Sequence, residues 1–456
     1  MRSFWVQALL WSLGLLGYHF LISAIYPASG VILRSTFPLY AILRPVFNAW
    51  AILPLLVFVG WLLVLRWYKK REFAQIPLLL AIFFVLELNV TMAMTRGGLP
   101  ALSEPFTRIT PKAKAEYLAD VDRVGVNPIT FMRDYSQLAP TLAIHSGTHP
   151  PGPILYLWLI SRIFSKGIKT AAWAAIIGTS FAVVPFYLLA RTLYGKRVSW
   201  YAVAIYAVTP SLVLFGATSM DGVFLFFPIL AAYFFHKSWK QAAVPYSILT
   251  GLALAAAMFF TFVTVCMGFV FTVEAIFSCR SSAISARIWK NLVYAGFTFG
   301  VVYYLIYLLT GYNVIDGFRT VVRLNAIYRT SVYIDLSHYF HVSVANLAAF
   351  LIGTGAITTA LWCREIFHAW SHWSARSTDF VQPAFALAIL LLAFAAIFAM
   401  ETERVWLFLM PFPILAAARQ VERHQREHSR SNAWSIVLIL LFGQTFATQL
   451  ILYTFW

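Results

Sequence analysis

Long apolar runs, separated by short polar or charged stretches, cover most of the sequence. A helix needs roughly 20 largely apolar residues to cross the hydrocarbon core of a bilayer. Judged by length and flanking charge, the pattern predicts about thirteen membrane-spanning helices. They are expected near residues 4–26, 46–66, 75–95, 170–190, 199–218, 222–236, 243–260, 262–278, 291–311, 342–362, 381–400, 405–418 and 434–454. The pattern therefore predicts an all-α polytopic membrane protein, with one integral membrane domain over residues 1–456.

Two longer polar stretches interrupt this pattern, and we expect them to form outer loops with helices of their own. The first covers residues 96–152 and the second covers residues 312–341. Directly after the first, residues 153–164 form an apolar run that is too short to cross a membrane. We interpret this run as a re-entrant or interfacial half-helix, because a crossing here would place the basic group around Arg191 and Lys196 on the outer side.

This topology separates basic from acidic residues. With the N-terminus inside, the basic residues of the short connections gather on the inner side, as the positive-inside tendency requires. More than half of the acidic residues then lie on the outer side, together with His145 and His149. Ionisable chemistry is therefore predicted on one face, in the two long loops and in a short turn at 401–404.

Composition supports the membrane assignment. The chain is 61% hydrophobic and 11% charged, whereas a soluble domain is roughly 45–50% apolar and about 25% charged. A large separate soluble domain is thereby excluded. The net charge of +17 indicates membrane orientation and contact with lipid headgroups, and no nucleic-acid partner is expected. The three cysteines share no repeated spacing, which argues against a disulfide scaffold or a zinc site.

The first outer loop holds two acidic residues four positions apart, Glu116 and Asp120. On a helix they would share one face. Two close carboxylates raise the pKa of one of them, and such a carboxylate can act as a general base. The alternative is a solvated loop helix whose acids neutralise Lys112, Lys114 and Arg123.

Residues 145–153 read His-Ser-Gly-Thr-His-Pro-Pro-Gly-Pro and end where the short apolar run begins. Prolines in a first turn favour the start of a helix. A half-helix that begins at membrane depth directs its unpaired N–H groups outward, and an anion such as a phosphate fits there. His145, His149 and Gly152 are therefore candidate binding residues. The alternative is an elbow that only turns the chain.

Further charges lie at the ends of apolar runs. Asp221 lies between two such runs, where an acid either has a partner or water or caps the next helix. Glu401, Glu403 and Arg404 form a short charged turn. They either make a local ion pair, or Arg404 binds a lipid-linked phosphate bidentately, which Lys does less well.

The second outer loop contains Arg319 and Arg323, with aromatic residues recurring around them. Such a segment either lies on anionic headgroups or covers a polar substrate as a lid. Glu87 and Glu274 lie within apolar runs and are functional candidates for that reason. The sequence identifies no partner for either.

In this order, these residues resemble the glycosyltransferase superfamily with the GT-C fold, particularly the branch of protein O-mannosyltransferases and the lipid A aminoarabinose transferase. That branch opens its first large outer loop with an acidic motif followed by Tyr, which Glu116 and Tyr117 match. A His/Lys-Pro-Pro motif some thirty residues later is matched by the segment from His149.

The resemblance extends over residues 75–420. The stretch 209–221 is similar to a proline-then-aspartate stretch of the branch, and 401–406 to a late Glu-x-x-Arg-x-Trp stretch of its bacterial relatives. One departure concerns the usual Asp-Glu pair, which is here Ala115 followed by Glu. That departure leaves Glu116, Asp120 or Asp134 open as the base.

The resemblance implies transfer of a sugar, with inversion, from a polyprenyl-phosphate donor to a hydroxyl of a lipid, glycan or protein acceptor. The reaction would take place in the cell envelope, on the outer side of a multi-pass cytoplasmic membrane protein. Glu116 is the expected base, Asp120 the second choice, and Asp221 positions the acceptor or completes the acidic pocket. The expected substrate- and phosphate-binding residues are Tyr117, His145, His149, Gly152, Arg323, Glu401 and Arg404. A divalent metal ion is compatible with several acids, but no residue is assigned as its ligand.

A transporter or flippase of a lipid-linked or anionic solute is the alternative function. It predicts inverted repeats with matching broken helices in both halves, and the sequence has no second Pro-Pro-Gly segment to match residues 150–152. A non-catalytic accessory subunit would leave the one-sided group of acids unexplained.

Overall fold

The structure is a computed structural model. It describes residues 39–69, 78–107, 116–217, 219–280, 282–326, 336–371, 380–395, 401–428 and 432–454, together with Leu10 and Ile397. The expected span at 4–26 lies outside the described residues, apart from Leu10. So do Lys112, Lys114 and Ala115 of the first outer loop.

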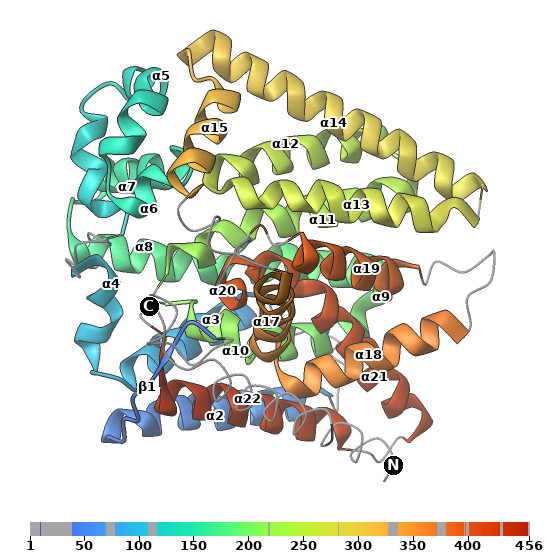
Figure 1. Ribbon diagram of the computed structural model, residues 1–456. Helices are drawn as coiled ribbons and strands as arrows, with labels where there is room; N and C mark the ends of the chain where they lie inside the picture. Colours follow the sequence, from blue (N-terminus) through green and yellow to red (C-terminus); the bar gives the residue numbers. More distant parts are fainter. Residues whose placement is uncertain are drawn as a thin grey trace.

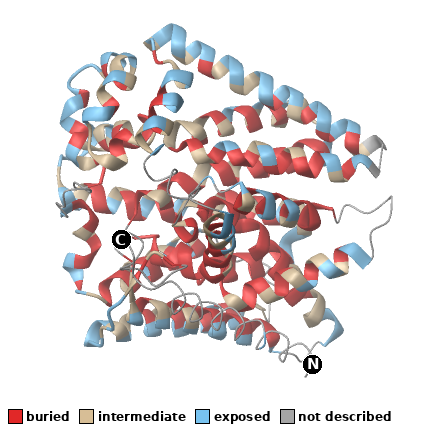
Figure 2. Ribbon diagram, viewed as in Figure 1, coloured by how far each residue is buried: buried red, intermediate tan, exposed pale blue. Residues whose placement is uncertain are grey.

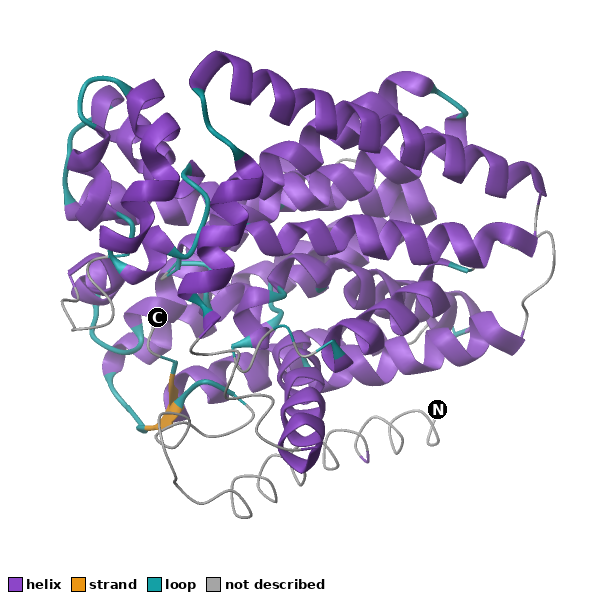
Figure 3. Ribbon diagram, turned by 45° about the horizontal axis from the view of Figure 1, so that its top comes forward, coloured by secondary structure: helices purple, strands orange, loops and turns teal. Residues whose placement is uncertain are grey.

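Helices make up nearly all of the described structure (Figure 3). The α-helices are α2 (Ile52–Lys69), α3 (Leu78–Met94), α4 (Glu104–Thr107), α5 (Pro128–Leu138), α6 (Ile144–Gly147), α7 (Gly152–Ile163), α8 (Ile168–Phe181), α9 (Val183–Tyr206), α10 (Pro210–Leu214), α11 (Phe226–Gln241), α12 (Val244–Phe260), α13 (Cys266–Phe277), α14 (Ser282–Thr310), α15 (Val314–Leu324), α17 (Leu336–Thr354), α18 (Ala356–Ser371), α19 (Val381–Phe394), α20 (Thr402–Val405), α21 (Pro411–Glu427) and α22 (Ala433–Ile451).

Short 3-10 helices connect several of these elements. They are η2 (Ala49–Ala51), η3 (Leu99–Ser103), η4 (Leu118–Val124), η5 (Ala139–Thr141), η6 (Met220–Leu225), η7 (Phe262–Val265), η8 (Ser278–Arg280) and η10 (Leu407–Leu409). The described strands β1 (Ile42–Leu43) and β2 (Leu452–Tyr453) pair antiparallel, with Ile42 opposite Tyr453. This pairing ties the segment before α2 to the end of α22.

The all-α membrane class predicted from the sequence is confirmed, but the count of thirteen spans is not. Among the described residues, six helical segments are long and apolar enough to cross a membrane, or up to seven if the bent pair Leu78–Met94 and Leu99–Thr107 is one span. Four further apolar helices, α7, α12, α13 with η7, and α19, are shorter than the longest crossing segments. Apolar length alone could not show where helices break or merge.

Proline and glycine set many of these breaks. Pro153 and Pro411 lie in the first turns of α7 and α21, where a missing N–H costs nothing. The segment Ile168–Tyr206 contains the predicted span 170–190 and the start of the predicted span 199–218. Within it, Gly195 has a φ of 84°, a conformation that glycine adopts readily. The chain kinks there instead of forming a separate loop.

Most long helices lie side by side, while α17 is seen nearly end-on and runs across them (Figure 1). Buried residues fill the middle of the bundle, whereas α2 and α14 at its margins are largely exposed (Figure 2). The short helices α4 to α7 gather at one end, and α15 lies beside α5. This end group contains the first predicted outer loop and positions the candidate site.

Candidate active site

Arg404 lies at the centre of a group of buried charges. Its side chain is only 8% exposed, and its Nη1 lies 3.1 Å from Oδ2 of Asp221. Its Nη2 donates to Oε2 of Glu401. Burial lowers the pKa of Arg404, but the nearby carboxylates of Asp221, Glu401 and Glu116 outweigh burial and raise it. The guanidinium therefore stays charged among three acids.

Asp221 is fixed by the start of η6. Ser219 caps that helix by accepting the backbone N–H of Asp221, and its hydroxyl donates to Oδ2 of Asp221 over 2.7 Å. Asp221 is therefore not the N-cap residue itself. Its carboxylate faces Arg404 instead, as the alternative of a paired intramembrane acid predicted.

Two acids around Arg404 have an unusual backbone. Glu401 has a φ of 67° and Glu116 a φ of 47°, although residues with a side chain rarely adopt positive φ. Each such conformation costs of order 1–3 kcal/mol and is found mostly at functional sites. The backbone conformations that place these two acids therefore lower the stability of the fold.

The expected helical pairing of Glu116 with Asp120 is wrong. Glu116 lies outside any helix because of its positive φ, and residues 118–124 form the 3-10 helix η4. Asp120 is buried, and its Oδ2 accepts the backbone N–H of Ala143 over 2.9 Å. Asp120 thus holds the loop before α6 in place, while Glu116 contributes to the charge around Arg404.

Aromatic side chains bring the separate segments together. The ring of Tyr117 meets the ring of His149 edge-on at 5.6 Å between centroids, and lies 6.2 Å from the ring of Phe224. His149 and Phe224 are also in contact, at 6.0 Å. Three stretches far apart in the sequence therefore meet at one point, and Asp221 links them to Arg404. We call Glu116, His149, Asp221, Glu401 and Arg404 the Arg404 cluster.

Tyr135 of α5 supports residues 145–149, which we call the histidine loop. It is fully buried, and its hydroxyl lies between the carbonyl oxygens of Ser146, at 2.6 Å, and of His149. Sequence reasoning missed this residue, because a tyrosine in an amphipathic loop helix carries no signal of a long-range contact.

His149 has a defined protonation state. Its Nδ1 lies 3.1 Å from the carbonyl oxygen of His145, which can only accept, so Nδ1 carries a proton. Burial lowers the pKa of His149, with Asp221 opposing and Arg404 adding to that effect. Burial and Arg404 also keep the pKa of His145 well below its usual value. Both imidazoles are therefore neutral near pH 7, and Nε2 of His149 is an acceptor.

Tyr117 is shielded from ionisation. Burial raises its pKa well above the usual value, and Asp221 and Glu116 raise it further, while Arg404 opposes them. Its hydroxyl therefore keeps its proton across the physiological range and remains a hydrogen-bond donor.

Gly152 opens α7, as the Pro-Pro-Gly pattern predicted. A Cβ atom at this position would lie 2.2 Å from the carbonyl oxygen of Phe259 at the end of α12. Glycine is therefore needed for the close approach of α7 to α12.

Arg323 lies on α15 at the margin of the site. Its Nη2 donates to Oγ1 of Thr320 over 3.2 Å. The following residue, Leu324, packs near Gly147 in the histidine loop. The structure thus brings α15 against the loop without placing Arg323 in the Arg404 cluster.

Glu403 was not among the expected binding residues. Its side chain is buried, and Oε1 accepts the backbone N–H of Tyr40 over 2.7 Å. Burial raises the pKa of Glu403 to about 7, although the hydrogen bond from Tyr40 opposes this. This contact links the segment before β1 to α20, over a sequence distance that no local pattern could indicate.

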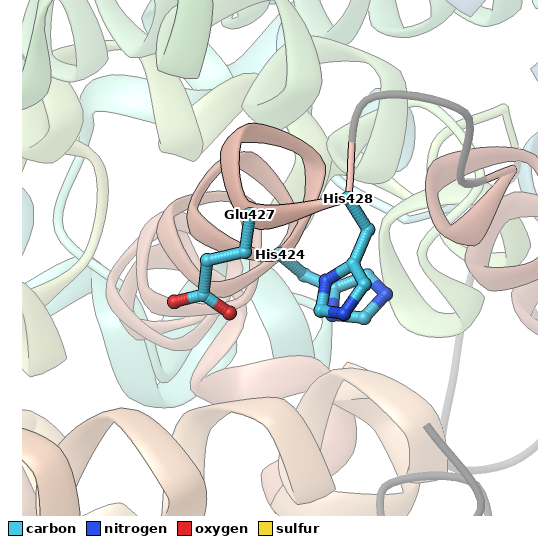
Figure 4. Close-up of side chains that lie close together, drawn as sticks. All are labelled: His424, Glu427 and His428. Atoms are coloured by element: carbon cyan, nitrogen blue, oxygen red, sulfur yellow. The ribbon is translucent and has the colours of Figure 1, made fainter.

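One group of side chains among the described residues has the spacing of metal ligands. His424, Glu427 and His428 at the end of α21 have ligand atoms within 4.8 Å of one another. Figure 4 shows the two imidazoles together and the carboxylate of Glu427 turned to another side. The rings are stacked at 4.6 Å, and the group lies far along α21 from Arg404. Within the described part of the chain, the carboxylates around Arg404 form no group of this kind.

An apolar groove of about 780 Å³ lies between α12, α13, α14 and α19. Val293 and Phe269, which line it, are also exposed on the surface. The groove reaches Ile397, only four residues before Glu401. Four residues span at most about 14 Å, so the Ile397 end of the groove lies within that distance of Glu401 in the Arg404 cluster.

Comparison with known proteins gives a family match. The family model of dolichyl-phosphate-mannose-protein mannosyltransferases matches residues 148–309. That segment contains His149, Asp221 and Phe224 of the site. No curated protein sequence matches the chain.

Solved structures with a similar arrangement come from Archaeoglobus fulgidus. One is an oligosaccharyltransferase tethered to an acceptor peptide, with 14% identity, 85% of this chain and 56% of that chain covered, and a TM-score of 0.48. Another is the oligosaccharyltransferase AglB in complex with an inhibitory peptide and a dolichol-phosphate, with 10% identity, coverage of 84% and 56%, and a TM-score of 0.49. The chain spans little more than half the length of these proteins. The resemblance to glycosyltransferases of the GT-C type, predicted from the sequence, is confirmed by the family match.

Proposed function

We propose that this chain is a membrane glycosyltransferase that moves a sugar from a polyprenyl-phosphate donor to an acceptor hydroxyl. The Arg404 cluster is its active site, on the outer side of the cytoplasmic membrane. The observation that carries the proposal is the meeting of Glu116, Asp221 and Glu401 around one buried guanidinium, next to a neutral histidine.

Glu116 is the proposed general base. It takes the proton of the acceptor hydroxyl while the hydroxyl oxygen attacks the anomeric carbon. The bond between that carbon and the phosphate oxygen breaks, and its electron pair stays on the phosphate. Attack opposite the leaving group inverts the anomeric configuration. Asp120 is the less favoured base, because its carboxylate already accepts the backbone N–H of Ala143.

Arg404 is the proposed partner of the departing phosphate. A fixed guanidinium stabilises charge that develops on a leaving group in a site sheltered from water. The neutral His149 offers an acceptor at Nε2, which suits a hydroxyl of the sugar or acceptor. The hydroxyl of Tyr117 remains protonated and can donate. Asp221 and Glu401 hold the guanidinium in the orientation required.

The apolar groove is the proposed site for the polyprenyl tail of the donor. It is lined almost entirely by apolar side chains, opens where Val293 is exposed, and ends within reach of Glu401. A lipid carrier that enters from the bilayer would therefore bring its phosphate to Arg404. The description of the matching family, dolichyl-phosphate-mannose-protein mannosyltransferases, supports a lipid-phosphate donor of this class and a protein acceptor beside lipid or glycan acceptors.

Turnover of defined donors tests the proposal. Purified protein in liposomes is incubated with polyprenyl-phosphate sugars and an extract of envelope acceptors, and release of free polyprenyl phosphate is followed by mass spectrometry. The wild type should release it, and Glu116→Gln should not. Asp122→Asn is the matched control, since Asp122 is exposed and pairs with Lys166 at the surface. The absence of release with every donor, or normal release by Glu116→Gln, would overturn the proposal. Movement of intact donor across the bilayer would favour a flippase.

Accessibility labelling tests the side of the membrane. A cysteine at Asp122 should react with an impermeant reagent added outside, and a cysteine at Lys196 should react only after the inner side is opened. Reaction of position 196 from outside would mean that α7 crosses the membrane and would contradict the proposed topology.

A further inference from the structure

Two ionisable side chains meet inside the bundle, away from the Arg404 cluster. His236 of α11 and Glu274 of α13 are both 0% exposed, and Nε2 of His236 lies 3.0 Å from Oε2 of Glu274. An isolated charge in such surroundings is strongly disfavoured, so buried acids and histidines are retained in pairs. The sequence had singled out Glu274 without a partner, and the structure supplies one.

The protons of this pair can be counted. Nδ1 of His236 lies 2.8 Å from the carbonyl oxygen of Ala232, which can only accept, so Nδ1 carries a proton. One further proton lies between Nε2 and Oε2, because two bare acceptors would repel at this distance. Whichever atom holds that proton, the pair has no net charge. It is therefore a neutral contact between α11 and α13.

A second polar contact joins α11 at the same turn. Nδ2 of Asn291, on α14, donates to the carbonyl oxygen of Phe235 over 3.0 Å, and Asn291 is buried. Polar contacts of this kind hold helices together where lipid offers no other partner. Thus α13 and α14 are both tied to α11 through adjacent residues, Phe235 and His236.

These two helices are also two of the four that line the apolar groove. Thr272 of α13 and Trp289 of α14 line the groove, each two positions before the residue that contacts α11. Residues two apart on a helix do not face the same way. Each wall therefore presents a polar side chain to α11 and mostly apolar side chains to the groove.

We propose that His236, Glu274 and Asn291 are positioning residues that set the width of the groove and thereby its fit to a long polyprenyl tail. The proposal rests on the proposed function, since it takes the lipid donor as the occupant. Because α11 follows directly on η6, which carries Asp221, the same helix fixes the groove walls and part of the Arg404 cluster. Tail binding and phosphate placement are then set by one element.

The test compares donors with long and short tails. The double variant His236→Leu/Glu274→Leu removes the link without leaving a buried charge, and Asn291→Leu removes the second contact. We expect KM for a long-chain polyprenyl-phosphate sugar to rise about tenfold in each, with kcat within twofold. KM for a donor with a two-isoprene tail should not change. The matched control is Thr445→Val, which breaks a buried contact between α22 and the carbonyl oxygen of Val208, neither of which lines the groove.

Equal changes in KM for the long-chain and the short-chain donor, or an unchanged KM for the long-chain donor, would overturn the proposal. Each single leucine variant should melt at a lower temperature than the double variant, because it leaves one member of the pair unsatisfied. Retention of long-chain polyprenyl phosphate is measured in parallel by native mass spectrometry. If no donor turns over, the proposed function fails, and retention still decides the inference: equal retention by the wild type and the double variant would contradict it.

Discussion

Two buried groups of carboxylates and arginines differ in their balance of charge. In the Arg404 cluster, one guanidinium faces Asp221 and Glu401, with Glu116 nearby. Further along, between α18 and α21, one carboxylate faces several donors. There Oε1 of Glu365 lies 2.9 Å from Arg419, while Oε2 lies 2.6 Å from Gln420 and 3.2 Å from Arg423.

The difference separates a structural group from a reactive one. Both carboxylate oxygens of Glu365 accept hydrogen bonds from side chains of α21, and the Glu365 side chain is 0% exposed. This acid therefore connects α18 to α21. The Arg404 cluster has acids in excess and neutral imidazoles beside them. It can therefore accept a proton and still present one fixed positive charge. Residue types alone could not distinguish the two groups, since both contain Glu and Arg in apolar surroundings.

The largest expected effect concerns the two arginines. Arg404→Lys should lower turnover of the lipid donor 100- to 1000-fold, because Lys provides a point charge without the planar pair of donors. Arg419→Lys should change turnover less than twofold. Release of polyprenyl phosphate measures both. Similar losses in the two variants would mean that the two groups do not differ in function.

Glu365→Gln should lower the stability of the fold and leave turnover of the donor nearly unchanged. Loss of this charge leaves Arg419 and Arg423 without their shared acid and should lower the free energy of unfolding by about 3 kcal/mol, the low end for a broken buried pair. Both arginines are partly exposed, at 22% and 24%, which limits the loss. Thermal unfolding in detergent measures it. Turnover per folded molecule should stay within twofold, and an unchanged melting temperature would contradict the structural assignment.

The raised pKa of Glu403 predicts that the stability of the protein depends on pH. Its pKa is raised from 4.5 to about 7, chiefly by burial. The unfolded chain therefore loses this proton first, and the free energy of unfolding falls as the pH rises from about 4.5 to 7, by roughly 3 kcal/mol. Glu403→Gln should remove this fall. Between pH 5 and pH 8 the melting temperature of the wild type should fall relative to that of the variant, whereas parallel curves would contradict the placement of Glu403.

Tyr135→Phe should have the smallest effect. Loss of the hydroxyl that holds the carbonyls of Ser146 and His149 should cost about 1 kcal/mol and lower kcat/KM about fivefold. Tyr453→Phe is the control, because its hydroxyl donates to Oε1 of Glu104, outside the Arg404 cluster and the groove lining. Equal kcat/KM in the two variants would show that the histidine loop needs no support from α5.

The sequence predicted more of the site than of the span count. His149, Asp221 and Arg404 could be found because each lies at the end of an apolar run, where a polar or charged side chain is unusual. Glu116 was found by its spacing to Asp120. The positive φ of Glu116 and the role of Tyr135 depend on contacts between distant segments. For the same reason, Glu274 could be noticed, but its partner His236 on another helix could not.

Two roles distinguish the Arg404 cluster from the group around Glu365: Arg404 binds the donor phosphate, and Glu116 removes the proton of the acceptor hydroxyl. Equilibrium binding of a polyprenyl-phosphate sugar to Glu116→Gln and Arg404→Lys, combined with single-turnover transfer, tests these roles most directly. We predict that Glu116→Gln binds the donor as tightly as the wild type but transfers no sugar, while Arg404→Lys binds it at least tenfold more weakly. Transfer by Glu116→Gln at the wild-type rate would contradict the account.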